Sequence, residues 1–124
     1  YFLNMRTYYN EEPTEFFRDQ YHAEIRLGIQ QEPTAEDSDT AQWSATVIPA
    51  FAPFSQNKFI ESAMSLKYGN DYEDKLINEY NAANLGIYDE ETSRAMTERY
   101  KAFLANRKSM KQDIERICIE NNIE

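Results

Sequence analysis

The residue types best suited to chemistry in this chain are its one cysteine, Cys118, and its one histidine, His22. A catalytic cysteine needs a neighbouring base and an electropositive pocket that stabilise its thiolate. Cys118 instead lies between Ile117 and Ile119, which is typical of a packing residue. His22 falls on the polar side of an alternating segment, and nothing in the sequence brings it near Cys118. We therefore expect no cysteine-based catalytic site.

The sequence also lacks the residues that metal sites and phosphate sites need. One cysteine and one histidine cannot form a usual zinc site. The segment GNDYED places Asp71, Glu73 and Asp74 close together, but it lacks the pattern of a calcium loop, and acids at the start of a helix explain it better. The three glycines form no phosphate-binding motif. We predict no metal, no cofactor and no catalytic residue, hence a protein that is not an enzyme. An active site of dispersed residues is the alternative.

Six basic residues gather between positions 94 and 111 around a single acid. They are Arg94, Arg99, Lys101, Arg107, Lys108 and Lys111, and the acid is Glu98. Such a band can bind phosphates or an acidic partner, or it can pair with nearby acids and keep a long helix soluble. The net charge of −9 disfavours binding to nucleic acid. We predict pairing with acids and no nucleic-acid partner.

The segment EPTAEDSDT at 32–40 is a polar, acidic turn or loop. Its residues Glu36, Asp37 and Asp39 form a candidate acidic surface. Such a surface would suit an inhibitor, for example an anti-defence protein that presents acids to a host enzyme.

Three stretches alternate apolar and polar residues with a period of two, which is typical of strands with one wet face. They cover residues 1–9, 21–31 and 41–48. The acidic loop joins the last two, so we predict a hairpin of 21–31 with 41–48 and a first strand beside it. Residues 14–20 stay open between helix and loop, because helical spacing also aligns Phe17 with Tyr21.

The uncharged segment PAFAPF at 49–54 marks the change from strand to helix periodicity. Pro49 is expected to end the third strand because proline cannot donate to a ladder, and Pro53 keeps the preceding residue extended. The segment is too apolar for a flexible linker. We predict a stiff joint in which Phe51 and Phe54 pin the sheet to the helices. The alternative is that both rings stay exposed and dock a partner.

Helical spacing after this joint predicts three helices, separated at Gly69 and Gly86. The last, from Asp89 to about Asn121, carries a heptad-like seam. The seam consists of Met96, Tyr100, Phe103, Arg107, Met110, Ile114 and Ile117, with Arg107 its one charged member. A helix of about 32 residues is ~48 Å long. Either the first two helices together line its whole length, or its far end packs on another chain. Arg107, Met110, Ile114 and Ile117 are therefore candidate interface residues, with self-association through 94–121.

Strands followed by helices predict an α+β fold: a small antiparallel sheet of about three strands, then three helices, the last one long. A chain of 124 residues, 41% hydrophobic and 14% aromatic, suits a single domain with its own core. We divide this domain, residues 1–124, into a β part at 1–48, a Pro/Phe joint at 49–54 and a helical part at 55–124.

The compartment follows from what the sequence lacks. A single cysteine allows no intrachain disulfide, and YFLNMRTYYN lacks the basic and long apolar parts of a secretory signal. The longest uncharged run, 40–57, contains two interior prolines and several polar residues, which disfavours a membrane span. We expect a cytoplasmic protein with no membrane partner, located in the host cytoplasm or the virion if a phage encodes it.

We carry three functional hypotheses. The leading one is a small acidic, non-catalytic protein–protein interaction or assembly module, such as an accessory protein of a phage or mobile element, which binds a protein partner or itself. The second is an inhibitor that presents an acidic surface. The third is an enzyme whose dispersed site the sequence does not reveal.

Overall fold

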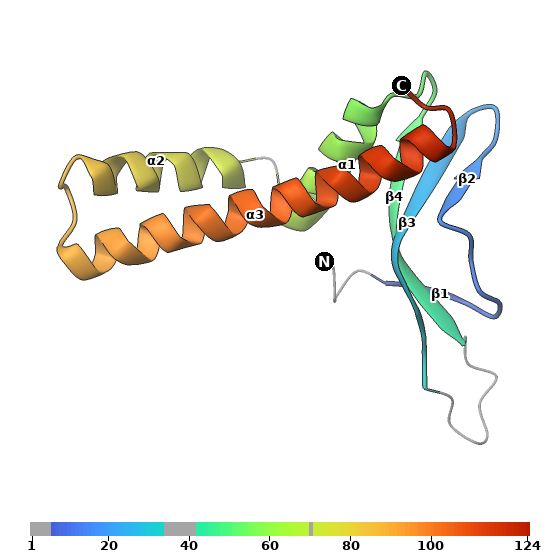
Figure 1. Cartoon of the computed structure of the whole chain (residues 1–124), viewed down its shortest axis with the longest axis horizontal. Coiled ribbons are helices and arrows are strands. Elements are labelled where there is room, and N and C mark those ends of the chain that lie inside the picture. The colour runs from blue at the N-terminus through green and yellow to red at the C-terminus, as the bar shows by residue number, and fades with distance from the viewer. Residues whose placement is uncertain (1–5, 34–41, 70) are drawn as a thin grey trace.

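The computed structural model describes residues 6–33, 42–69 and 71–124. A four-stranded antiparallel sheet precedes three helices, the last of them long, so the α+β prediction is confirmed (Figure 1). The elements are β1 (Thr7–Tyr9), β2 (Phe16–Arg18), β3 (His22–Gln31), β4 (Trp43–Phe51), α1 (Gln56–Tyr68), α2 (Tyr72–Asn84) and α3 (Glu90–Glu120). None of the helices in these described ranges is both long and apolar enough to cross a membrane.

The predicted hairpin forms the centre of the sheet. β3 and β4 pair antiparallel, with Ile25 opposite Ile48, and β1 adds to the other side of β4. β2 pairs with β3 through Phe16 and Ile25, which gives the strand order β1-β4-β3-β2. The segment that the sequence leaves open between helix and loop therefore contains a short strand, and the sheet has four strands rather than about three.

β4 continues through Pro49 to Phe51, so the expectation that Pro49 ends the strand is wrong. Pro49 lies opposite Glu24 of β3, whereas β1 pairs with β4 only near the start of that strand. Within the described residues, the other edge of β4 has no strand partner at Pro49, and proline is tolerated on such an edge. The Ala52–Pro53 peptide bond beyond the strand is cis.

The helices begin and end at the residues whose chemistry favours caps. Ser55 Oγ accepts a hydrogen bond from the backbone N–H of Lys58 at 3.2 Å, and Asp89 Oδ1 accepts one from Thr92 at 2.7 Å. These bonds satisfy backbone donors that have no partner within the helix. Gly86, at φ 75°, follows α2 in the left-handed region where only glycine is unstrained.

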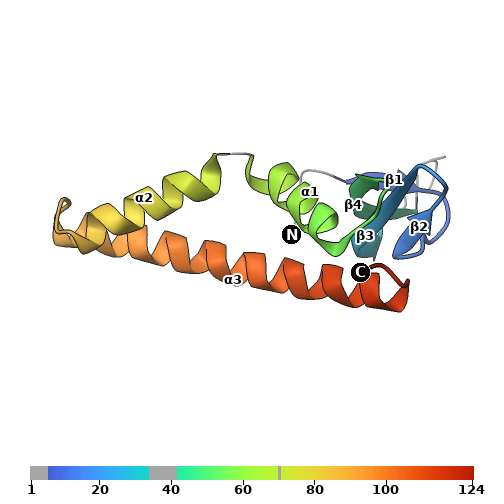
Figure 2. The ribbon, with the colours of Figure 1, turned by 90° about the horizontal axis from the view of Figure 1, so that it is seen from above.

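One face of the sheet packs against α1 and the C-terminal half of α3 (Figures 1 and 2). The buried core comprises Ala23, Ile25 and Leu27 of β3, Ile48 and Ala50 of β4, Phe59, Ile60 and Ala63 of α1, Met110, Ile114, Ile117 and Cys118 of α3, and Ile123. In β3 the predicted alternation thus corresponds to a covered face and an open face. In β4 the core face carries Ile48 and Ala50, so the alternating apolar residues Trp43, Ala45 and Val47 lie on the opposite face, against the expectation. Polar residues such as His22 and Glu24 lie on the open face.

The N-terminal half of α3 extends beyond the sheet and pairs with α2 in a projecting helical hairpin (Figures 1 and 2). Leu76 of α2 and Phe103 of α3 are buried in this region, and the rings of Tyr80 and Tyr100 lie 4.9 Å apart. α1 and α2 therefore line α3 in succession. Both halves of the 31-residue helix thus pack against helices of its own chain, with a break where α1 gives way to α2, which is close to the first of the two alternatives.

Candidate functional site

Cys118 and His22 lie on opposite sides of the sheet from one another. Cys118 belongs to the buried core, where burial, and secondarily the charge of Glu115, raises the pKa of its thiol to about 11. A thiol in this state is a poor nucleophile. His22 lies on the open face with acidic partners, Asp19 at 2.8 Å and Glu24 at 3.7 Å. The described residues contain no group of three or more metal-ligand side chains.

The basic band of α3 pairs largely with acids of the same chain. The ion pairs are Arg94 with Glu90 at 3.4 Å, Arg99 with Glu79 at 3.2 Å, Lys101 with Glu98 at 3.7 Å and Lys111 with Glu115 at 3.8 Å. Arg107 and Lys108 form no ion pair or hydrogen bond with any residue that the structure describes. Lys108 is exposed, whereas the Nε atom of Arg107 is buried. Arg107 is therefore the member of the band that is unpaired and partly buried, and it is also the charged member of the seam.

The other three candidate interface residues of the seam lie in the chain's own core. Met110, Ile114 and Ile117 are at most 1% exposed, and α1 and the sheet cover them. In this fold they are not free to contact a second chain, so the heptad-like spacing reflects packing within the chain. The acidic candidates Glu36, Asp37 and Asp39 lie outside the described residues.

The two aromatic residues of the joint lie in different surroundings. Phe54 packs against the core, and the guanidinium of Arg18 lies 4.8 Å from the centre of its ring. Phe51 is 72% exposed at the end of β4, next to Tyr21, whose carbonyl accepts a hydrogen bond from Ala52. Phe54 therefore joins the sheet to the helices, whereas Phe51 remains a candidate interface residue.

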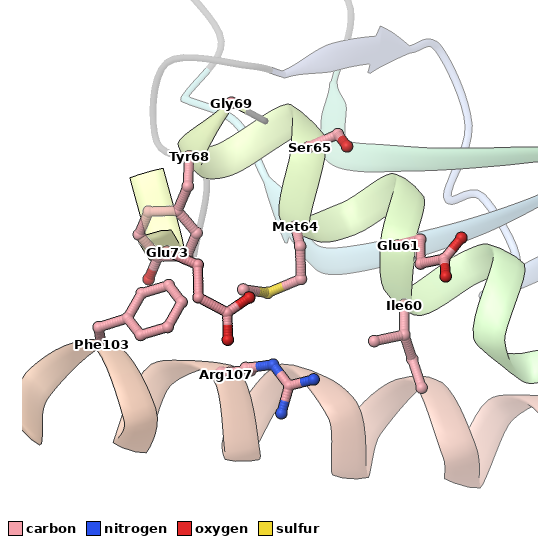
Figure 3. A pocket seen from close by; sticks show the side chains of 9 residues that line it. All are labelled: Ile60, Glu61, Met64, Ser65, Tyr68, Gly69, Glu73, Phe103 and Arg107. Atoms are coloured by element: carbon pink, nitrogen blue, oxygen red, sulfur yellow. The ribbon is translucent and has the colours of Figure 1, made fainter. Parts of the chain in front are cut away.

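A pocket lies where α1 ends, α2 begins and α3 passes beneath both (Figure 3). Its volume is about 410 Å³, within the range of roughly 300–1,000 Å³ that is typical of small-molecule sites. We call it the junction pocket. It is lined by Ile60, Glu61, Met64, Ser65, Tyr68, Gly69, Glu73, Phe103 and Arg107. His22 and Cys118 do not contribute to it.

Two polar atoms of the junction pocket's lining residues are buried and have no partner within the described ranges of the chain. They are Nε of Arg107 and the hydroxyl of Tyr68. Figure 3 shows the Glu73 carboxylate and the Arg107 guanidinium both directed toward the middle of the pocket, yet they form no ion pair. The ring of Tyr68 is held by Phe103 at 4.9 Å and by Tyr72 at 5.0 Å. The pocket thus combines opposite charges with a fixed aromatic wall.

The far end of the helical hairpin carries exposed apolar side chains. Leu85 is 78% exposed, Ile87 is 70% exposed and Tyr88 is 36% exposed. We call these three residues the hairpin tip. In this turn the backbone N–H groups of Gly86 and Ile87 donate to carbonyls of the last turn of α2. These bonds hold the backbone from which the three side chains extend into solvent.

No protein-family model, curated protein or solved structure matches this chain. The candidate functional features therefore come from the structure of the chain itself, and they are the hairpin tip and the junction pocket. The sequence analysis misses both, because the tip residues lie on either side of Gly86 without a periodic pattern and the pocket is formed by residues of three different helices. One signal for the pocket is present, since Arg107 interrupts an otherwise apolar seam.

Proposed function

We propose that this chain is a non-catalytic protein–protein interaction module that docks on its partner through the hairpin tip. The observation that carries the proposal is the exposure of Leu85 and Ile87 at the end of a hairpin that projects from the sheet (Figure 1). Single exposed apolar residues are common on soluble proteins. Neighbouring ones on a projecting element are typical of an interaction site.

Burial of the exposed tip side chains would contribute substantially to the free energy of docking. Burying a leucine or isoleucine side chain completely is worth about 1.5–3 kcal/mol. Because Leu85 and Ile87 are 78% and 70% exposed, docking both would contribute about 2–4 kcal/mol, or roughly 30- to 1,000-fold in affinity. Tyr88 adds a ring with a polar end, a residue type enriched at interfaces.

The flanking charges indicate the chemistry of the partner. Asp89, Glu90 and Glu91 follow the tip directly, and no basic residue lies between Leu85 and Glu91. A complementary partner therefore has an apolar pocket with a basic rim, since like charges across an interface are costly.

The test uses a matched pair of exposed isoleucines. Ile119 is 68% exposed near the end of α3, against 70% for Ile87 at the tip. A photo-crosslinking amino acid is placed at position 87 or at position 119 of the full chain, and the adducts formed in a source-cell lysate are compared. A defined protein adduct at position 87 that is absent at position 119 supports the proposal. Equal adducts at both positions, or none at either, contradict it.

The identity of the adduct then separates the versions of this function. Titration with the captured protein should show at least about tenfold weaker binding for Ile87→Glu and unchanged binding for Ile119→Glu. An adduct with a second copy of the chain would make this an assembly protein. An adduct with an enzyme whose activity falls on binding would make it an inhibitor.

A further inference from the structure

We propose that the junction pocket binds a free α-amino acid with an apolar side chain in its zwitterionic form. The inference is independent of the hairpin tip, which lies at the other end of α2. It rests on three properties of the lining: buried donors that have no partner among the described residues, an acid that faces Arg107, and apolar walls between them.

The donor set fits a carboxylate. Arg107 Nε and the Tyr68 hydroxyl are both buried and lack a partner among the residues that the structure describes, and a buried polar group without a partner is unfavourable. Guanidinium groups bind carboxylates through two parallel hydrogen bonds, for which Nε and one Nη atom suffice. A carboxylate in the pocket would give the Arg107 guanidinium the partner that it lacks among the described residues.

The opposing acids argue against a simple anion. Figure 3 shows the Glu73 carboxylate directed toward the middle of the pocket, whereas Glu61 lies at the rim on α1. A plain anion would meet Arg107 but be repelled by both acids, and a plain cation would be repelled by Arg107. A ligand with an ammonium group beside its carboxylate matches both, with the ammonium toward Glu73.

The walls favour an apolar side chain. Ile60, Met64 and Phe103 line the pocket together with the Tyr68 ring. Met64 is unbranched and adaptable, so it can adjust to aliphatic groups of different shape. A leucine-like or methionine-like side chain therefore fits better than a charged one.

The experiment is an NMR titration of the ¹⁵N-labelled chain with three probes of similar shape: L-leucine, isopentylamine and 4-methylpentanoate. We expect saturable shifts of the Gly69 amide and the Arg107 Nε–H signal with L-leucine at millimolar concentration, and clearly weaker shifts with the other two. No shift at these signals with L-leucine would overturn the proposal. Equal affinity for L-leucine and 4-methylpentanoate would overturn the zwitterion assignment.

Variants separate the pocket from general charge effects. Arg107→Gln should bind L-leucine about tenfold or more weakly, whereas Lys108→Gln, an exposed neighbour outside the pocket, should bind like the wild type. Glu73→Gln should lose the preference for L-leucine over 4-methylpentanoate, while Asp74→Asn keeps it. The dispersion of each amide spectrum reports folding directly. Undiminished binding by a folded Arg107→Gln variant would contradict the assignment.

Discussion

Replacing Phe54 with alanine should destabilise the fold substantially, whereas the same replacement of Phe51 should leave stability almost unchanged. The two residues lie three positions apart in one uncharged segment, so sequence alone treats them alike. In the structure Phe54 is half-buried against the core with Arg18 over its ring, and Phe51 is 72% exposed. The pair therefore tests the packing of the joint with an internal control.

The expected magnitudes follow from burial. A fully buried phenylalanine replaced by alanine costs about 3–5 kcal/mol, and a half-buried one with a cation–π contact costs about 2–3 kcal/mol. An exposed side chain contributes within about 0.5 kcal/mol. Since each kcal/mol shifts the melting temperature of a domain of this size by roughly 3–6 °C, Phe54→Ala should melt about 6–18 °C lower. Phe51→Ala should melt within about 3 °C of the wild type.

Urea unfolding measures the loss of unfolding free energy in each variant, and a thermal melt measures the two melting temperatures. The fluorescence of Trp43, the one tryptophan, and far-UV circular dichroism give two probes of the same transition, and coincidence of the two curves checks two-state behaviour. A shifted midpoint with an unchanged slope is a change in stability itself. If Phe51→Ala were as destabilising as Phe54→Ala, the placement of Phe51 in solvent would be wrong, and Phe51 would also cease to be a candidate for docking.

Two further predictions concern ionisable groups. Cys118 is buried and the pKa of its thiol is raised to about 11. A thiol reagent should therefore label the native protein only as fast as the fold opens locally, whereas the chain unfolded in urea should be labelled at once. Rapid labelling of the native chain would contradict this burial. Arg116 donates a hydrogen bond to Glu15 at 2.8 Å and thereby lowers the pKa of the Glu15 carboxyl below its usual value of 4.5. The stability that this pair contributes is therefore present above pH 4.5 and is lost as the pH falls through the lower pKa of the folded state. Glu15→Gln should therefore be less stable than the wild type at neutral pH and approach it in acid, and a difference that does not vary with pH would refute the pairing.

The parts of the fold that the sequence predicts are those fixed by local chemistry. Ser55 and Asp89 cap their helices through their own side chains, and Gly86 ends α2 at a positive φ that other residues avoid. The alternation in β3 predicts that Ala23, Ile25 and Leu27 face the core, and register follows from it because a slip by one residue would expose every apolar side chain. Each of these signals is contained within a few residues.

The parts that it mispredicts depend on distant partners. Pro49 remains in a strand because β1, more than 30 positions earlier in the chain, stops short of it. Phe16 enters a strand because β3 offers it an edge. The heptad-like seam of α3 is compatible with packing against another chain and with packing against its own chain. In the structure α1 and the sheet cover Ile114, so the seam packs within the chain. Nothing near these residues in sequence carries that information.

The change of packing partner along α3 explains why the junction pocket lies at Arg107. α3 is covered first by α2 and then by α1, and the change from one partner to the other falls at Tyr68, Gly69 and Glu73, opposite Phe103 and Arg107. A continuous apolar seam needs a continuous partner, and two helices joined by a bend cannot provide one at the bend itself. An apolar residue at position 107 would face this gap, whereas an arginine can reach a polar ligand within it. The charged member of the seam therefore stands at the position where the long helix changes partners, and this is the reason to look for a ligand there before anywhere else in the core.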